Sequence, residues 1–88
     1  MVTEKEIEQT LKQKVEAKGG LCLKFISPGW EGAPDRICLW PGGNVSFYEI
    51  KRTGEHPRPL QERRLEQLRR LGFKAEVIDS KEGACGAS

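Results

Sequence analysis

A Pro-Gly-Gly-Asn turn at residues 41–44 is the feature that most restricts how this chain can fold. It lies between two short runs of apolar and β-prone residues, at 36–40 and 45–51, and this pattern predicts an antiparallel hairpin. A hairpin folded about Gly42 places residue 35 opposite residue 49, because the two positions are equally far from the turn. Opposed residues in an antiparallel pair share a face, with Cβ atoms about 5 Å apart. The two residues that meet in this way are both acidic, Asp35 and Glu49.

Two carboxylates at this separation repel each other unless a positive charge neutralises them. A divalent cation is the expected partner, because Mg²⁺ and Mn²⁺ prefer oxygen ligands and leave positions for water and phosphate. Lys51 is two residues after Glu49 in the same strand, so its ammonium points to the same side. A metal and an ammonium together suit phosphodiester hydrolysis. The structural alternatives are a turn-forming Asp35 after Pro34 and an exposed ion pair of Glu49 with Lys51.

The remaining pattern predicts a small α/β domain with the order α-β-β-β-α-β. The first helix is expected at 4–18, where Thr3 and Glu6 form a capping box and Gly19-Gly20 ends the helix. Strands are expected at 21–26, 36–40, 45–51 and 73–79. The second helix is expected at 59–71, and its core-facing residues are Leu60, Leu65, Leu68 and Leu71.

The chain of 88 residues is expected to form one domain, with a core at about 3–80 and a flexible tail at 81–88. A helix between the third and fourth strands favours a parallel pair, so the small sheet flanked by helices should be mixed.

The cysteine and histidine content restricts the cell compartment and the kinds of metal or disulfide site that this chain can have. Three cysteines without a CxxC pair, and one histidine, argue against a disulfide framework and a zinc site. The sequence shows no signal peptide and no long apolar run, which predicts an intracellular, reducing setting without a membrane span.

A basic stretch extends from residue 51 to residue 74, with eight Lys or Arg residues and three Glu residues. This balance suits the phosphate backbone of DNA, and the candidate contacts are Arg52, Arg58, Arg63 and Arg64. The alternative is a solvated helix face with ion pairs. Two rival functions stay open: a basic module that binds nucleic acid without cutting it, and a protein-interaction adaptor that keeps the fold and has lost activity.

Two motifs resemble those of a nuclease family. The segment 32–36, Gly-Ala-Pro-Asp-Arg, and the segment 48–51, Tyr-Glu-Ile-Lys, resemble the PD…(D/E)xK motif of the restriction-endonuclease-like superfamily. Their order, spacing and flanks are similar to those of the stand-alone virus-type replication-repair nuclease (VRR-NUC) domain, over about residues 4–79. The resemblance implies a restriction-endonuclease-like α/β core and metal-dependent cleavage of DNA.

The resemblance also implies roles for single residues. Asp35, Glu49 and the Ile50 carbonyl match the metal ligands, Lys51 matches the catalytic lysine, and Gln61 matches a glutamine of the second helix. A glutamate of the first helix is a further expected ligand: Glu8, beside the apolar stripe, or Glu4, one turn earlier. A capping or solvent-facing role is the alternative for both glutamates, and an exposed position is the alternative for Gln61.

The small size and the resemblance together predict a homodimer that acts on branched DNA such as a four-way junction. The implied setting is replication or repair of a phage or mobile element, in the cytoplasm of a bacterium or a phage-infected host cell.

Overall fold

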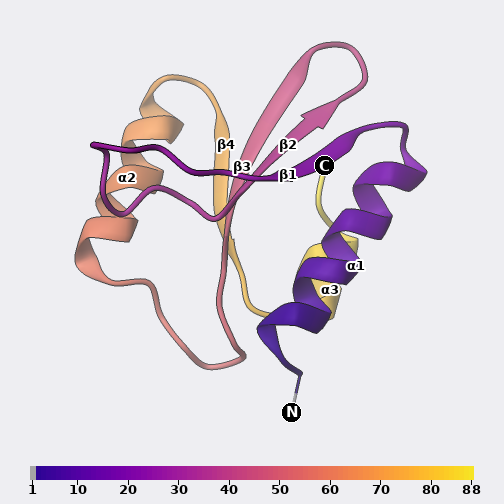
Figure 1. The fold of residues 1–88 in the computed structure, drawn as a ribbon, viewed down its shortest axis with the longest axis horizontal. Helices are drawn as coiled ribbons and strands as arrows, with labels where there is room; N and C mark the ends of the chain where they lie inside the picture. The colour runs from indigo at the N-terminus through magenta and orange to yellow at the C-terminus, as the bar shows by residue number, and fades with distance from the viewer. Residues whose placement is uncertain (1) are drawn as a thin grey trace.

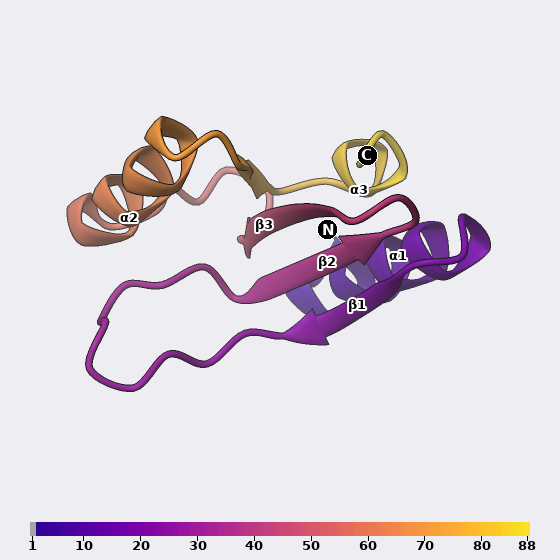
Figure 2. The same ribbon diagram turned by 90° about the horizontal axis from the view of Figure 1, so that it is seen from above.

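A computed structural model describes residues 2–88 and consists of a four-stranded sheet with helices on both faces (Figures 1 and 2). The sheet order is β1-β2-β3-β4, with antiparallel pairs except for the parallel pair of β3 and β4. The predicted mixed sheet and the order of its elements are confirmed. The elements are α1 (Glu4–Ala17), β1 (Leu21–Lys24), β2 (Arg36–Trp40), β3 (Asn44–Ile50), α2 (Pro59–Arg70), β4 (Lys74–Ile78) and α3 (Lys81–Cys85).

Helix α1 begins with the capping box that its sequence predicts. The Thr3 hydroxyl accepts from the Glu6 amide at 3.2 Å, and the Glu6 carboxylate accepts from the Thr3 amide at 3.3 Å. These two bonds satisfy amides that the helix itself leaves free. After the helix, Gly20 passes so close to β2 that an added Cβ would lie 2.5 Å from the Leu39 carbonyl oxygen. The entry into the sheet therefore requires glycine at this position.

Alternate residues of the inner strand β3 pack into two separate apolar clusters, because successive side chains point to opposite faces of a sheet. Tyr48 and Ile50 pack with the stripe of α1 and with α3. Phe47 faces the other way and packs with Leu65 and Leu68 of α2. Helices α1 and α3 thus cover one face and α2 covers the other (Figure 2). Glu49 has the same orientation as Phe47, so it is placed on the α2 side.

The C-terminal segment differs from its predicted flexible state. Residues 81–85 form α3, capped by the Ser80 hydroxyl, which accepts from the Gly83 amide at 2.9 Å. Ala84 and Ala87 are buried in the cluster that includes α1. The Tyr48 hydroxyl also donates to the Ser88 carbonyl at 3.2 Å. Small residues carry this packing, so the segment lacks the large apolar side chains from which a docked helix is recognised.

Helix α2 buries a different set of residues from the four predicted leucines. Leu65 and Leu68 are buried, and Leu60 is partly buried. Leu71 is 75% exposed, because the helix ends at Arg70 and Leu71 is its C-cap. Gln61 is buried on the inner face instead. Among residues 2–88, no helix is long and apolar enough to cross a membrane.

Candidate active site

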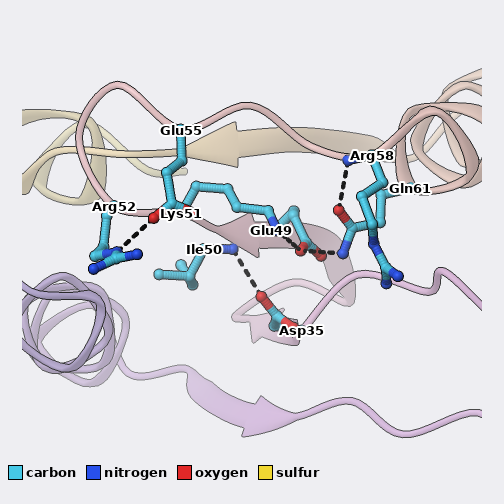
Figure 3. Close-up of polar contacts among 8 residues, drawn as sticks. All are labelled: Asp35, Glu49, Ile50, Lys51, Arg52, Glu55, Arg58 and Gln61. Carbon is cyan, nitrogen blue, oxygen red and sulfur yellow. Dashed lines mark hydrogen bonds and ion pairs between the residues drawn. The ribbon is translucent and has the colours of Figure 1, made fainter.

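The β2–β3 hairpin brings Asp35 and Glu49 together as its turn predicts. The paired residues run from Trp40 with Asn44 to Arg36 with Tyr48, so residue 42 is the centre of the hairpin. Asp35 and Glu49 are the next positions outward, and Asp35 lies just before β2 begins. The Asp35 carboxylate accepts a hydrogen bond from the Ile50 amide at 3.0 Å (Figure 3). Asp35 is thereby anchored to the backbone beside Glu49.

Glu49 is a buried carboxylate with a defined set of neighbours. Glu49 as a whole is 2% exposed. The Gln61 amide donates to Glu49 Oε2 at 2.8 Å, and the Lys51 ammonium lies 3.5 Å from the same oxygen. Gln61 is itself oriented, because its Oε1 accepts from the Arg58 amide at 2.8 Å where α2 begins (Figure 3). Strand β3 and the first turn of α2 therefore fix the carboxylate from two sides.

This environment raises the pKa of Glu49 from 4.5 to about 7. Burial is the largest cause, and the negative charge of Asp35 acts in the same direction. The Lys51 ammonium opposes both effects without cancelling them. The cluster thus holds two carboxyl groups and one ammonium, and the ionised form of Glu49 is unfavourable without a further positive charge.

The second Glu49 oxygen indicates what that positive charge could be. Within residues 2–88, Glu49 Oε1 is the one buried side-chain oxygen or nitrogen atom without a hydrogen-bond partner. A buried, unsatisfied acceptor beside a second carboxylate suits a hard divalent cation, which takes oxygen ligands. Asp35 and Glu49 could supply two such ligands, and the carbonyl of Ile50 could supply a neutral third. The described chain contains no cluster of three or more His, Cys, Asp or Glu residues that could hold a metal.

The structure does not bring Glu8 into this cluster. Glu8 pairs with Arg36, with 2.9 Å between Glu8 Oε2 and Arg36 Nη2. Arg36 follows Asp35 in the chain, so its side chain leaves the opposite face of the sheet, toward α1. Glu4 is exposed in the first turn of α1 and does not join Asp35 and Glu49 either. The acidic ligand from the first helix stays a prediction: in this structure Glu8 forms an ion pair with Arg36 and lies outside the cluster of Asp35 and Glu49.

The four arginines predicted to bind phosphate fall into two groups. Arg58 and Arg63 are exposed at the start of α2. Arg52 instead pairs with Glu55 (Figure 3). Arg64 is partly buried and covers the ring of Trp30, in the loop between β1 and β2. Of the four, Arg58 and Arg63 are the two that are exposed and make no ion pair within the described residues 2–88.

Sequence reasoning missed the contact of Arg64 with Trp30, which joins two segments far apart in the chain. It found Gln61 only through a family resemblance. The local signal for Gln61 is its position in the helix: it is four residues before Leu65 and therefore lies on the same inner face.

Comparison with known proteins is consistent with this site. No family model matches the chain. The chain is 40% identical over 82 residues to "Putative nuclease p44" of Acyrthosiphon pisum secondary endosymbiont phage 1, covering 93% of this chain and 88% of the phage protein. It also resembles a solved structure described as "VRR_NUC domain", with a TM-score of 0.86 and 33% identity. That match covers 92% of this chain and 88% of the solved one.

Proposed function

Because the chain belongs to the VRR-NUC family of nucleases, we propose that it is a divalent-metal-dependent endonuclease that hydrolyses phosphodiester bonds in DNA. The observation that carries this proposal is the buried Glu49 beside the partly buried Asp35, in which one Glu49 oxygen has no partner within residues 2–88. A nearby cation stabilises the ionised form of a buried carboxylate whose oxygen has no hydrogen-bond partner. The expected cation is Mg²⁺ or Mn²⁺, held by Asp35, Glu49 and the Ile50 carbonyl.

When bound, such an ion supplies an activated water and stabilises the charge that develops on the phosphate. The residues of the chain then have separate tasks. Asp35 is oriented by the Ile50 amide, and Glu49 is oriented by Gln61. The Lys51 ammonium, on the same side of β3 as Glu49, is placed to orient the attacking water or to contact a phosphate oxygen. Arg58 and Arg63 are the exposed cations that would contact the DNA backbone nearby.

We further propose that the working unit is a homodimer that cuts branched DNA. Leu21 and Leu23 of the edge strand β1 are 54% and 45% exposed. They leave the sheet on the side opposite Cys22, which packs toward α1. Helix α2 lies on the side of β3 and β4, away from β1 (Figure 2). Burial of these leucines between two copies would add apolar contact to a small core. A two-fold pair of sites would also suit a substrate with two-fold symmetry, such as a four-way junction.

The likeness to a phage protein supports a setting in phage replication or repair, in the cytoplasm of a bacterial host. The alternative is a basic module that binds nucleic acid without cutting it, favoured by the exposed cations at the start of α2.

A cleavage assay separates these two functions. Labelled linear duplex, flap and four-way junction DNA are incubated with the protein in Mg²⁺, in Mn²⁺ or in EDTA. We expect cleavage that depends on the cation, is fastest on junctions and is lost in Asp35→Asn and Glu49→Gln. Glu76→Gln, which removes an exposed carboxylate of β4, is the matched control and should cut normally. Binding of all three DNAs without cleavage under any condition would favour the non-catalytic module.

A further inference from the structure

We propose that Arg64 is a positioning residue of the active site, which holds the loop between β1 and β2 so that Asp35 stays opposite Glu49. This role differs from the phosphate contact that its place in a basic stretch suggests. The effect of Arg64 on catalysis rests on the proposed nuclease function. Its effect on the position of Asp35 is a property of the metal-free protein and can be measured without activity.

The guanidinium of Arg64 is directed at the protein rather than at solvent. Its central carbon lies 5.0 Å from the centroid of the Trp30 ring. Its Nε donates to the Glu31 carbonyl at 2.8 Å, and its Nη1 donates to the Gln67 side chain at 3.0 Å. One side chain of α2 thus contacts two consecutive loop residues, one through its face and one through a hydrogen bond.

The next loop residue contacts α2 independently of Arg64. Gly32 has a φ of 82°, and a Cβ at this position would lie 2.8 Å from Leu60 Cγ. The loop backbone is therefore in direct contact with the first turn of the helix. Residues 30–32 form a continuous segment bound to α2, and only two residues separate this segment from Asp35.

Residues 33 and 34, which connect this segment to Asp35, have a restricted backbone. Pro34 is fully buried, and its ring restricts the backbone immediately before Asp35. The Asp35 carbonyl accepts from the Phe25 amide at 2.8 Å, and its carboxylate accepts from the Ile50 amide at 3.0 Å. Asp35 is thus held by β3 on one side and by the loop on the other, and the loop is held by Arg64.

The same helix controls the other carboxylate. Gln61 and Arg64 are three residues apart and therefore lie on neighbouring positions of one helix face. Gln61 holds Glu49 directly, and Arg64 holds Asp35 through the loop. One face of α2 consequently contributes to the distance between the Asp35 and Glu49 carboxylates, on which the site depends.

Arginine is required by this contact and is not required by a phosphate contact. A planar guanidinium can stack on an indole and donate in fixed directions at once, whereas a lysine ammonium cannot do both. A lysine does, however, bind phosphate well as a point charge. Arg64→Lys therefore separates the two roles, and Arg63→Lys and Arg63→Ala, at the exposed neighbouring position, are matched controls.

The experiment begins with the metal-free protein in EDTA, so its outcome does not depend on nuclease activity. The Ile50 amide resonance reports the hydrogen bond to Asp35. We expect it to shift in Arg64→Lys and, in the same direction, in Trp30→Leu, while both Arg63 variants leave it unchanged. Circular dichroism identifies any variant that has unfolded. If Arg64→Lys unfolds, the folded Trp30→Leu protein decides the outcome.

Mn²⁺ titration and DNA binding complete the test. Loss of an outer contact that orients a metal ligand commonly weakens metal affinity by about 10–100-fold. Arg64→Lys should show a loss in that range, with an unchanged dependence of DNA affinity on salt. Arg63→Ala should do the reverse, lowering the slope of log affinity against log salt by about 0.9. An unshifted Ile50 resonance in both Arg64→Lys and Trp30→Leu would overturn the proposal, as would an Arg64→Ala variant that loses only salt dependence.

Discussion

Replacement of Glu49 by Gln should stabilise the metal-free protein at alkaline pH, although it removes a central residue of the site. The pKa of Glu49 is raised from 4.5 to about 7, chiefly by burial. The folded state therefore prefers the neutral carboxyl group, and glutamine is neutral at every pH. The side-chain oxygen of the introduced glutamine can still accept the hydrogen bond that Gln61 donates to Glu49 in the wild-type protein.

The sign and size of the effect follow from proton linkage. Below pH 4.5 the Glu49 carboxyl is protonated in both the folded and the unfolded chain. Between pH 4.5 and about 7 the unfolded chain releases the proton while the folded chain retains it, so stability falls as pH rises. Above pH 7 the loss is complete. At about 1.4 kcal/mol for each pH unit between the two pKa values, the loss is about 3 kcal/mol.

Urea unfolding in EDTA at pH 5 and pH 8.5 measures this difference. Glu49→Gln should be more stable than the wild type by about 0.7 kcal/mol at pH 5 and by about 3 kcal/mol at pH 8.5. With a urea m value of about 1–3 kcal/mol per M, the midpoints differ by about 1–3 M. Addition of Mg²⁺ at pH 8.5 should stabilise the wild type and narrow the gap, because bound metal favours the carboxylate.

Glu76→Gln is the control for loss of one carboxylate at an exposed strand position, and its urea midpoint at pH 8.5 should stay close to that of the wild type. A Glu49→Gln protein that is less stable than the wild type at pH 8.5, or equally stable at both pH values, would refute the reasoning about burial.

Three further predictions concern Lys51, the exposed arginines near α2 and helix α3. Lys51→Ala should lower the single-turnover rate at saturating enzyme by about 10²–10³-fold while DNA affinity changes little, and an unchanged rate would exclude Lys51 from the chemical step. The double variant Arg58→Ala and Arg63→Ala should reduce the slope of log DNA affinity against log salt by about 1.8, measured by titration at several salt concentrations; an unaltered slope would place DNA on another surface. Ala84→Asp puts an unpaired charge into the cluster of α1 and α3, so it should lower the free energy of unfolding by several kcal/mol in urea; a wild-type midpoint would mean that α3 does not dock.

Local physical chemistry made much of the site predictable. A Gly-rich turn sets the register of the two strands that flank it, so the meeting of Asp35 with Glu49 needed no knowledge of the rest of the fold. The two-residue period of a strand placed Lys51 beside Glu49 in the same way. The capping box at Thr3 was recognisable because both its partners lie within one turn.

Other features were decided by packing between segments that are distant in the sequence. Glu8 borders the apolar stripe of its helix, and only the approach of β2 determined that it would pair with Arg36, 28 residues away. The apolar residues of the tail are small, and Ala84 and Ala87 become buried because α3 packs against α1.

The sequence by itself determined the hairpin, its two acidic residues and the adjacent lysine, because neighbouring backbone geometry dictates those positions. Only the tertiary structure decided which groups surround them. Whether a basic side chain such as Arg64 faces solvent or holds a loop depends on which surface reaches it, and here Trp30 and Glu31 reach it from 33 or more residues away in the chain. Charge patterns within a helix carry no information about that distant contact.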